Sequence, residues 1–152
     1  MLTISVIKDR NIFDSQCQTI VNAVNCVGVM GKGVALEMKN RYPDMFEKYK
    51  KLCEDKLIDI GKLWLYNHIV EDEITKRILN FPTKTHWQYK SEYDYIEKGM
   101  QKFIETYQEK NITSIAFPML GCGNGGLDSD KVLQIMLKHL SQCDDLIVEI
   151  YK

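Results

Sequence analysis

The sequence has few of the features that mark membrane-bound, secreted or multidomain proteins. No apolar run approaches the ~20 residues that a bilayer crossing requires. The first residues lack the basic start and long apolar stretch of a signal peptide. With three prolines and no repeat or low-complexity segment, nothing indicates a linker, so residues 1–152 are predicted to form one domain. We expect a monomer that works in the cytoplasm and does not enter a membrane.

The cysteines also lack a pattern. There are five, an odd number, and no two are spaced as C-x-x-C. In a chain of this length, the simplest interpretation is reduced thiols in the cytosol. No histidine and cysteine have zinc-ligand spacing, so neither a metal nor another cofactor is expected. No triad spacing supports Cys26 or Cys122 as a nucleophile, and a small apolar role is favoured for both.

Charge is nearly balanced. Twenty basic and twenty-one acidic side chains leave a formal charge of −1. This balance supplies no broad attraction to nucleic acid or acidic lipid, although a local basic patch stays compatible with it. Hydrophobic residues make up 45% of the chain, which is enough to build a core without disulfides or metals.

Strand patterns alternate with helix patterns along the chain. Leu2, Ile4 and Val6 alternate as in a half-buried strand, and residues 19–24 are apolar and rich in β-formers. Ser91-x-x-Asp94 resembles a capping box that opens a helix. Further strands are expected at 62–67, 76–81, 113–117 and 146–150, and further helices at 34–40, at 45–53 and after Asp128 or Asp130. This order predicts an α/β layer fold with a mostly parallel or mixed sheet.

Two glycine-rich loops each follow a predicted strand and precede a predicted helix. The first spans residues 25–33, and the second has four glycines within residues 121–126. Glycine lets a ligand approach the backbone, and a helix start offers free N–H groups to a phosphate. Glycines that merely turn the chain are the alternative, but four in six residues exceed what a simple turn needs. Neither loop fits the P-loop or the dinucleotide motif.

Four motifs, in this order along nearly the whole chain, resemble the macrodomain family. They are Val21-Asn22-Ala23-Val24-Asn25, Gly28-Val29-Met30-Gly31-Lys32-Gly33-Val34-Ala35, Asn80-Phe81-Pro82-Thr83-Lys84-x-His86-Trp87 and Gly121-Cys122-Gly123-x-Gly125-Gly126-Leu127. The pattern is most similar to the DarG-type DNA ADP-ribosyl glycohydrolase macrodomains, and it also resembles the terminal ADP-ribose protein glycohydrolase branch. The resemblance implies a three-layer α/β/α sandwich around a six-stranded mixed sheet.

The resemblance also implies which residues bind ADP-ribose. Both loops would wrap the diphosphate and the distal ribose, with Asn25 near that ribose. Asn11 stands where many macrodomains have an aspartate that contacts adenine, and its amide oxygen can still accept a hydrogen bond. The expected ligand-binding residues are Asn11, Asn22, Asn25, Gly28, Val29, Met30, Gly31, Lys32, Gly33, Thr83, His86, Gly121, Cys122, Gly123, Asn124, Gly125, Gly126 and Leu127.

Lys84 is the expected catalytic residue, because the lysine at this motif position is catalytic in the resembling glycohydrolases. Its amine could attack a ring-opened sugar, or its ammonium could polarise the departing group. Outside the motif, a single lysine is ordinarily a solvated surface charge. His86 could orient substrate, transfer a proton or cap the loop, and Trp87 and Tyr89 could stack on a base or pack against the protein.

The resemblance implies an ADP-ribosyl glycohydrolase, an antitoxin-like enzyme that reverses the work of a cognate ADP-ribosyltransferase toxin. Its substrate would be ADP-ribosylated thymidine in DNA, or protein modified on acidic side chains. In the protein-directed branch a catalytic aspartate occupies the position of Gly125, so the glycine favours the DarG-like assignment. The alternatives are a non-catalytic ADP-ribose reader, a phosphatase or deacylase of ADP-ribose derivatives, and an unrelated nucleotide-binding domain.

Overall fold

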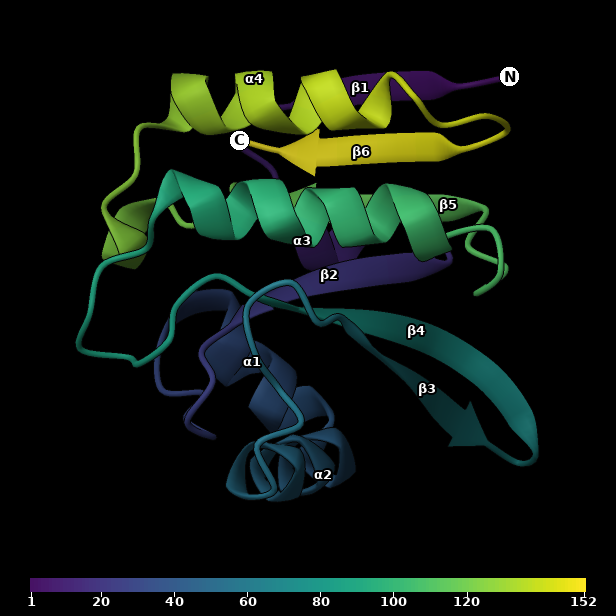
Figure 1. Cartoon of the computed structure of the whole chain (residues 1–152). Helices are drawn as coiled ribbons and strands as arrows, with labels where there is room; N and C mark the ends of the chain where they lie inside the picture. The colour runs from purple at the N-terminus through teal and green to yellow at the C-terminus, as the bar shows by residue number, and fades with distance from the viewer.

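A six-stranded sheet runs through the computed structural model, which describes residues 1–152 (Figure 1). The strand order is β1-β6-β5-β2-β4-β3, and only β3 is antiparallel to its neighbour. The predicted six-stranded mixed sheet is therefore confirmed. The strands are β1 (Thr3–Ile7), β2 (Thr19–Val24), β3 (Trp64–Val70), β4 (Glu73–Pro82), β5 (Ser114–Pro118) and β6 (Ile147–Tyr151).

Two pairs of helices cover the two faces of the sheet. One face packs against α1 (Gly33–Arg41) and α2 (Pro43–Glu54), and the other packs against α3 (Tyr93–Thr106) and α4 (Ser129–Leu140). Two short 3-10 turns, η1 (Ile12–Asp14) and η2 (Gly123–Gly125), complete the fold. The predicted α/β/α sandwich is confirmed. None of the helices combines the length and apolar character that a membrane crossing needs.

Alternation along the central strands divides the core between the two faces. On β2, Val21 packs with α3 and α4, whereas Ile20 and Val24 pack with α1 and α2. On β4, Leu79 and Ile78 divide in the same way. A strand covered on both faces is apolar at most positions, which explains the largely hydrophobic runs of β2 and β4, interrupted by the buried Asn22 and Asn80.

The parallel pairing of β5, β2 and β4 brings three connecting segments to one edge of the sheet. The carboxyl ends of these strands lie together, and β2 stays in register with β4 as far as Val24 and Pro82. The backbone N–H of Thr83 then donates to the carbonyl of Val24 at 2.8 Å. Residues 25–32, 83–92 and 119–128 therefore leave from the same edge, on the left in Figure 1. Ligands of open α/β sheets gather at such an edge.

The hairpin of β3 and β4 is longer than predicted. The strands continue to the directly paired Val70 and Glu73, and a two-residue turn joins them. Both turn residues, Glu71 and Asp72, have left-handed backbone angles, with φ of 51° and 65°. A two-residue turn with two positive φ angles matches the twist of a hairpin but is usually built from asparagine and glycine. The polar stretch Glu71-Asp72-Glu73 predicts a turn here, but its acidic residues do not predict the left-handed angles.

The predicted capping box at the start of α3 is wrong. Glu92 occupies the N-cap position without a side-chain hydrogen bond, and the backbone N–H of Ser91 donates instead to the carbonyl of Gly125 at 3.0 Å. Of the two aspartates proposed to open α4, Asp128 is the cap, because its carboxylate accepts from the N–H of Lys131 at 3.0 Å.

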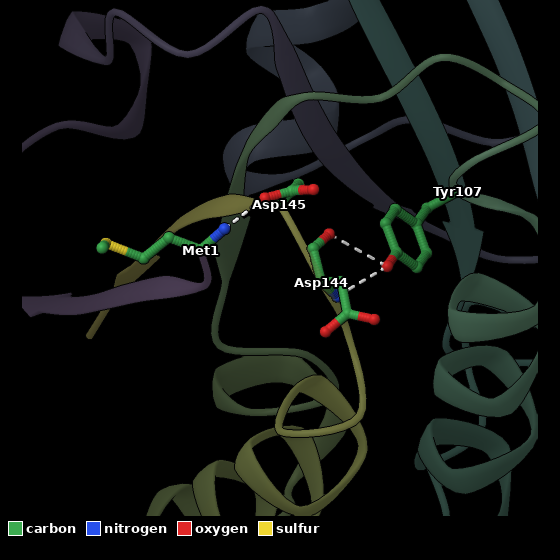
Figure 2. Close-up of polar contacts among 4 residues, drawn as sticks. All are labelled: Met1, Tyr107, Asp144 and Asp145. Carbon is green, nitrogen blue, oxygen red and sulfur yellow. Dashed lines mark hydrogen bonds and ion pairs between the residues drawn. The ribbon is translucent and has the colours of Figure 1, made fainter.

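A hydrogen-bonded tyrosine fastens α3 to the start of β6 at the opposite end of the molecule (Figure 2). The hydroxyl of Tyr107 accepts from the backbone N–H of Asp144 at 2.8 Å and donates to its carbonyl at 3.1 Å. Beside it, the amino group of Met1 pairs with the carboxylate of Asp145. Tyr107 is buried, whereas Met1 and Asp145 are exposed, so the tyrosine carries the larger share of stability.

We predict that Tyr107→Phe lowers the free energy of unfolding by about 1–2 kcal/mol, because both backbone groups of Asp144 lose a partner. Chemical denaturation measures the change. Tyr95→Phe is the matched control, since the Tyr95 hydroxyl bonds only the exposed carboxylate of Glu92, and its removal should change stability little. Equal effects of the two substitutions would contradict this assignment.

Candidate functional site

The first glycine loop is held in shape by Asn25. Its side-chain amide donates to the carbonyl of Val29 at 2.8 Å, and its side-chain oxygen accepts from the N–H of Val27 at 3.1 Å and from the hydroxyl of Tyr49 at 2.8 Å. Burial raises the pKa of the Tyr49 hydroxyl, so it remains a donor at neutral pH. Asn25 is itself 8% exposed. Its side chain thus shapes the loop and offers little surface to a ligand.

This loop leads into an uncapped helix. Lys32 is the N-cap of α1 and makes no side-chain hydrogen bond, and the first turn contains no acidic residue. The first N–H groups of the helix therefore have no partner within it, and they form the positive end of its dipole. Gly31, Lys32 and Gly33 are exposed there. By contrast, Asp128 already supplies a carboxylate to the start of α4. An anion is attracted to α1 and not to α4.

The second loop turns so tightly that two positions have no space for a side chain. Gly121 has φ of +73°, and a Cβ there would lie 2.7 Å from the Leu127 side chain. A Cβ on Gly125 would lie 2.5 Å from Oγ of Ser91. Ser91 is buried, and its hydroxyl has no hydrogen-bond partner within the chain. The loop is closed by a bond from the N–H of Leu127 to the carbonyl of Gly121 at 3.0 Å.

Lys84 lies beside this second loop. The segment after β4 carries it there, and its Cε is 3.9 Å from the point that a Cβ on Gly125 would occupy. The side chain is half-buried, and Nζ donates to the carbonyl of Trp87 at 3.3 Å. Two of the sequence motifs, far apart along the chain, therefore meet in space. The Lys84 amine lies next to a turn at which a glycine, Gly125, is required because Ser91 occupies the space that a side chain would need.

Two residues predicted to bind ligand have side chains that are buried in the core. Asn22 is 0% exposed and Met30 is 1% exposed. Asn22 donates to the side-chain oxygen of Asn80 at 3.1 Å, directly across the paired strands β2 and β4. Met30 lies over this pair, with its sulfur 3.8 Å from the Asn22 amide. Strand alternation turns Asn22 toward the α1 and α2 layer, where these side chains have a packing role.

Three other predicted residues are engaged in local structure. Asn11 is exposed and caps η1, with its side-chain oxygen accepting from the N–H of Phe13 at 2.9 Å. Thr83 is 5% exposed. Nδ1 of His86 accepts from the N–H of Gln88 at 3.1 Å, which supports the loop-capping interpretation of this histidine.

The remaining predicted residues differ in exposure. Val29 in the first loop and Gly123, Asn124 and Gly126 in the second are exposed, Cys122 and Leu127 are half-buried, and Gly28 is buried.

The cysteines near the loops are poor nucleophiles. Burial raises the pKa of Cys26 to about 12, and it also raises the pKa of Cys122. Both thiols stay protonated at neutral pH, and only a thiolate attacks readily. This agrees with the small apolar role inferred from the sequence. No three histidine, cysteine or acidic side chains come together as metal ligands would.

Two residues important to the loops escaped the sequence analysis. Tyr49 is a buried helix residue with nothing in its local pattern to connect it with Asn25, and Ser91 was assigned to a helix cap.

Two surface depressions lie away from the two glycine loops. One, of about 470 Å³, lies between α2 and Trp64, and the other, of about 600 Å³, lies beneath the hairpin near Gln18 and Arg77.

The fold and the site define an α/β/α domain in which an anion-attracting helix start, a glycine turn and a lysine meet at the carboxyl edge of the sheet. The model of the Macro domain matches residues 21–136. The chain therefore belongs to the macrodomain family.

The chain is similar to a Mycobacterium tuberculosis protein named DNA ADP-ribosyl glycohydrolase, with 43% identity over 141 residues, 93% of this chain and 40% of the relative. A Thermosipho africanus protein, named as a fusion of a DNA ADP-ribosyl transferase and a DNA ADP-ribosyl glycohydrolase, is 37% identical over 157 residues, 94% of this chain and 40% of the relative. The chain thus spans about 40% of the length of these curated relatives.

The chain is also similar to solved structures of DarG and DarTG. The macrodomain of Mycobacterium tuberculosis DarG has a TM-score of 0.90 and 42% identity, covering 99% of this chain and 97% of that one. Thermosipho africanus DarTG in complex with ADP-ribose has a TM-score of 0.89 and 36% identity, covering 98% of this chain and 41% of that one.

The contact between Ser91 and Gly125 yields a stability prediction. Gly125→Ala should lower the free energy of unfolding by about 1–3 kcal/mol, because the new methyl group meets the buried hydroxyl and the Cβ of Ser91. Placing Ser91→Gly in the same chain should remove most of that loss. A double-mutant cycle measured by denaturation gives the coupling. Gly31→Ala, whose Cβ would meet only ordinary contacts, is the control. Purely additive effects would refute the contact.

Proposed function

We propose that this chain is an ADP-ribosyl glycohydrolase that acts on ADP-ribosylated DNA and uses Lys84 as its catalytic residue. The observation that carries the proposal is the position of the lysine, whose Cε lies against the Gly125 turn. The segment after β4 and the second glycine loop, far apart in the sequence, thus bring an amine to the carboxyl edge of the sheet.

The diphosphate of ADP-ribose is proposed to lie between the two glycine loops. One phosphate would meet the uncapped start of α1 at Gly31, Lys32 and Gly33, where backbone N–H groups and the helix dipole favour an anion. The other would meet the exposed backbone of Gly123 and Asn124. This arrangement places the distal ribose beside Lys84, because Gly125 belongs to the same turn. Asn11 is the proposed adenine contact.

DNA as the carrier is supported by the relatives. The Mycobacterium tuberculosis and Thermosipho africanus proteins are both named for glycohydrolase action on DNA, and the matched DarTG structure contains ADP-ribose. The fusion of a transferase to a glycohydrolase in the second relative supports a cognate ADP-ribosyltransferase as the functional partner. We also propose a monomer in the cytoplasm, a location that the five free cysteines favour.

Two roles of the Lys84 amine fit its position. As a neutral amine it adds to the anomeric carbon while the ribose ring opens, the bond to the base breaks and the base leaves with a proton, and the resulting imine is hydrolysed by water to free ADP-ribose and the restored amine. As an ammonium it donates a hydrogen bond to the departing group while water attacks the anomeric carbon. Reduction with borohydride during turnover distinguishes the two, because only the imine becomes a stable covalent adduct.

We predict that Lys84→Ala lowers kcat for release of ADP-ribose from ADP-ribosylated thymidine DNA by at least about 100-fold. The affinity for free ADP-ribose should stay within about threefold, since the phosphate contacts are made by backbone groups. Single-turnover kinetics and calorimetry measure the two quantities.

Lys138→Ala, which removes an exposed lysine from α4, is the control and should match the wild type in both assays. If the wild type binds ADP-ribose but releases none from DNA or protein, the chain is a reader and the proposal fails. If Lys84→Ala retains full activity, the enzyme uses a different residue.

A further inference from the structure

The turn that follows Lys84 presents three aromatic rings, of which the central one, His86, contacts the other two. His86 stacks on Trp87 with ring centroids 5.5 Å apart and an interplanar angle of 27°, and it contacts Tyr89 at 5.0 Å. Trp87 is 51% exposed and Tyr89 is 62% exposed. Neither belongs to the hydrophobic clusters on the two faces of the sheet. Packing within the protein therefore does not account for these rings.

The turn is ordered by its own hydrogen bonds. The N–H of Tyr89 donates to the carbonyl of His86 at 3.1 Å, and the N–H of Gln88 donates to the ring of the same histidine at 3.1 Å. Lys84 donates to the carbonyl of Trp87 at 3.3 Å, and Ser91 bonds the second glycine loop. The exposed rings are thus held in place next to the proposed catalytic amine. A surface ordered before binding pays less entropy on binding.

The segment that carries these rings is positively charged although the whole chain carries −1. Residues 81–91 contain two lysines and no acidic residue. Lys90 runs along the second glycine loop, with its Cδ 3.6 Å from the point that a Cβ on Gly126 would occupy. The nearest acidic residue along the chain, Glu92, accepts a hydrogen bond from the Tyr95 hydroxyl. Exposed rings among lysines are the composition that binds single-stranded nucleic acid.

We infer that His86, Trp87 and Tyr89 form a stacking platform for the bases that adjoin the modified nucleotide in a single strand, and that Lys90 binds a phosphate of that strand. The inference rests on the proposed function and adds how the carrier is recognised. A single strand is favoured over a duplex, because base faces are available to aromatic rings only when unstacked from one another. A strand so bound brings its modified nucleotide to Lys84.

The test compares three substrates that carry the same ADP-ribose group. They are ADP-ribosylated thymidine nucleoside, an ADP-ribosylated single strand of about ten nucleotides, within the length that such sites cover, and a protein ADP-ribosylated on glutamate. Trp87→Ala and Tyr89→Ala should each lower kcat/KM for the strand by roughly tenfold, the loss of one stacked base. Values for the nucleoside should stay within about twofold of the wild type. Trp87→Phe should retain most of the activity because a phenyl ring still stacks.

Ile74→Ala is the control, since Ile74 is 57% exposed on the distant hairpin. A second measurement uses an unmodified single strand of the same length, whose Kd should weaken by roughly tenfold in Trp87→Ala, with the matching duplex bound more weakly by the wild type. This binding assay tests the inference even if the wild type releases no ADP-ribose. That second result would contradict the proposed function but not the inference.

Three outcomes would overturn the inference. Equal loss on the nucleoside and the strand would mean that the rings merely hold Lys84 in position. Unchanged kinetics and unchanged strand binding would mean that the rings have no part in recognition. A loss confined to the modified protein would make this turn a contact for a polypeptide carrier.

Discussion

The parallel pairing of β2 with β5 on one side and β4 on the other is the constraint on which the site depends. Because the three strands run in the same direction, the segments that follow them start at one edge of the sheet. If one of these strands ran in the opposite direction, the segment after it would start at the opposite end of the strands. The site would then lose residues 25–33, Lys84 or residues 121–127. Burial on both faces fixes the register, since a slip of one residue would exchange the Val21 and Ile20 sides of β2.

Around that edge, polar groups divide into those that the protein satisfies and those that it leaves open. The side-chain amide of Asn22 donates to Asn80, although the side-chain oxygen of Asn22 is buried without a partner, and Asn25 is held by Tyr49 and by its own loop. These side chains give the backbone its shape. The start of α1, in contrast, has no capping side chain. α2 and α3 also lack a capping side chain but have an acidic residue in the first turn, so α1 is the one helix whose start has neither, and it is where an anionic ligand is stabilised.

The local structure was largely readable from the sequence, because alternation on the strands and amphipathic spacing on α3 and α4 are properties of neighbouring residues. The strand order was not, since it depends on pairings such as Thr19 with Ile115 that no local pattern reveals. The polar turn between β3 and β4 was readable, but the left-handed angles of Glu71 and Asp72 were not, because such residues rarely adopt them.

The site was readable in the same uneven way. The two loops were predicted because clustered glycines indicate backbone that a ligand can approach closely. Lys84 was predicted from its position in a family motif. The layer of α1 and α2 covers the side chains of Asn22 and Met30, a contact between distant segments that the sequence motifs do not reveal. Ser91 was missed because its effect is to occupy space beneath Gly125, and occupied space has no sequence signature.

The central claim is that the backbone of two loops binds one diphosphate next to Lys84. Titrating ¹⁵N-labelled protein with ADP-ribose, and following each backbone amide by NMR, tests it most directly. The account predicts the largest shifts at the amides of residues 31–35 and 121–127, with smaller shifts along residues 84–90. Shifts concentrated in the depression near Gln18 and Arg77, with both glycine loops unchanged, would contradict it.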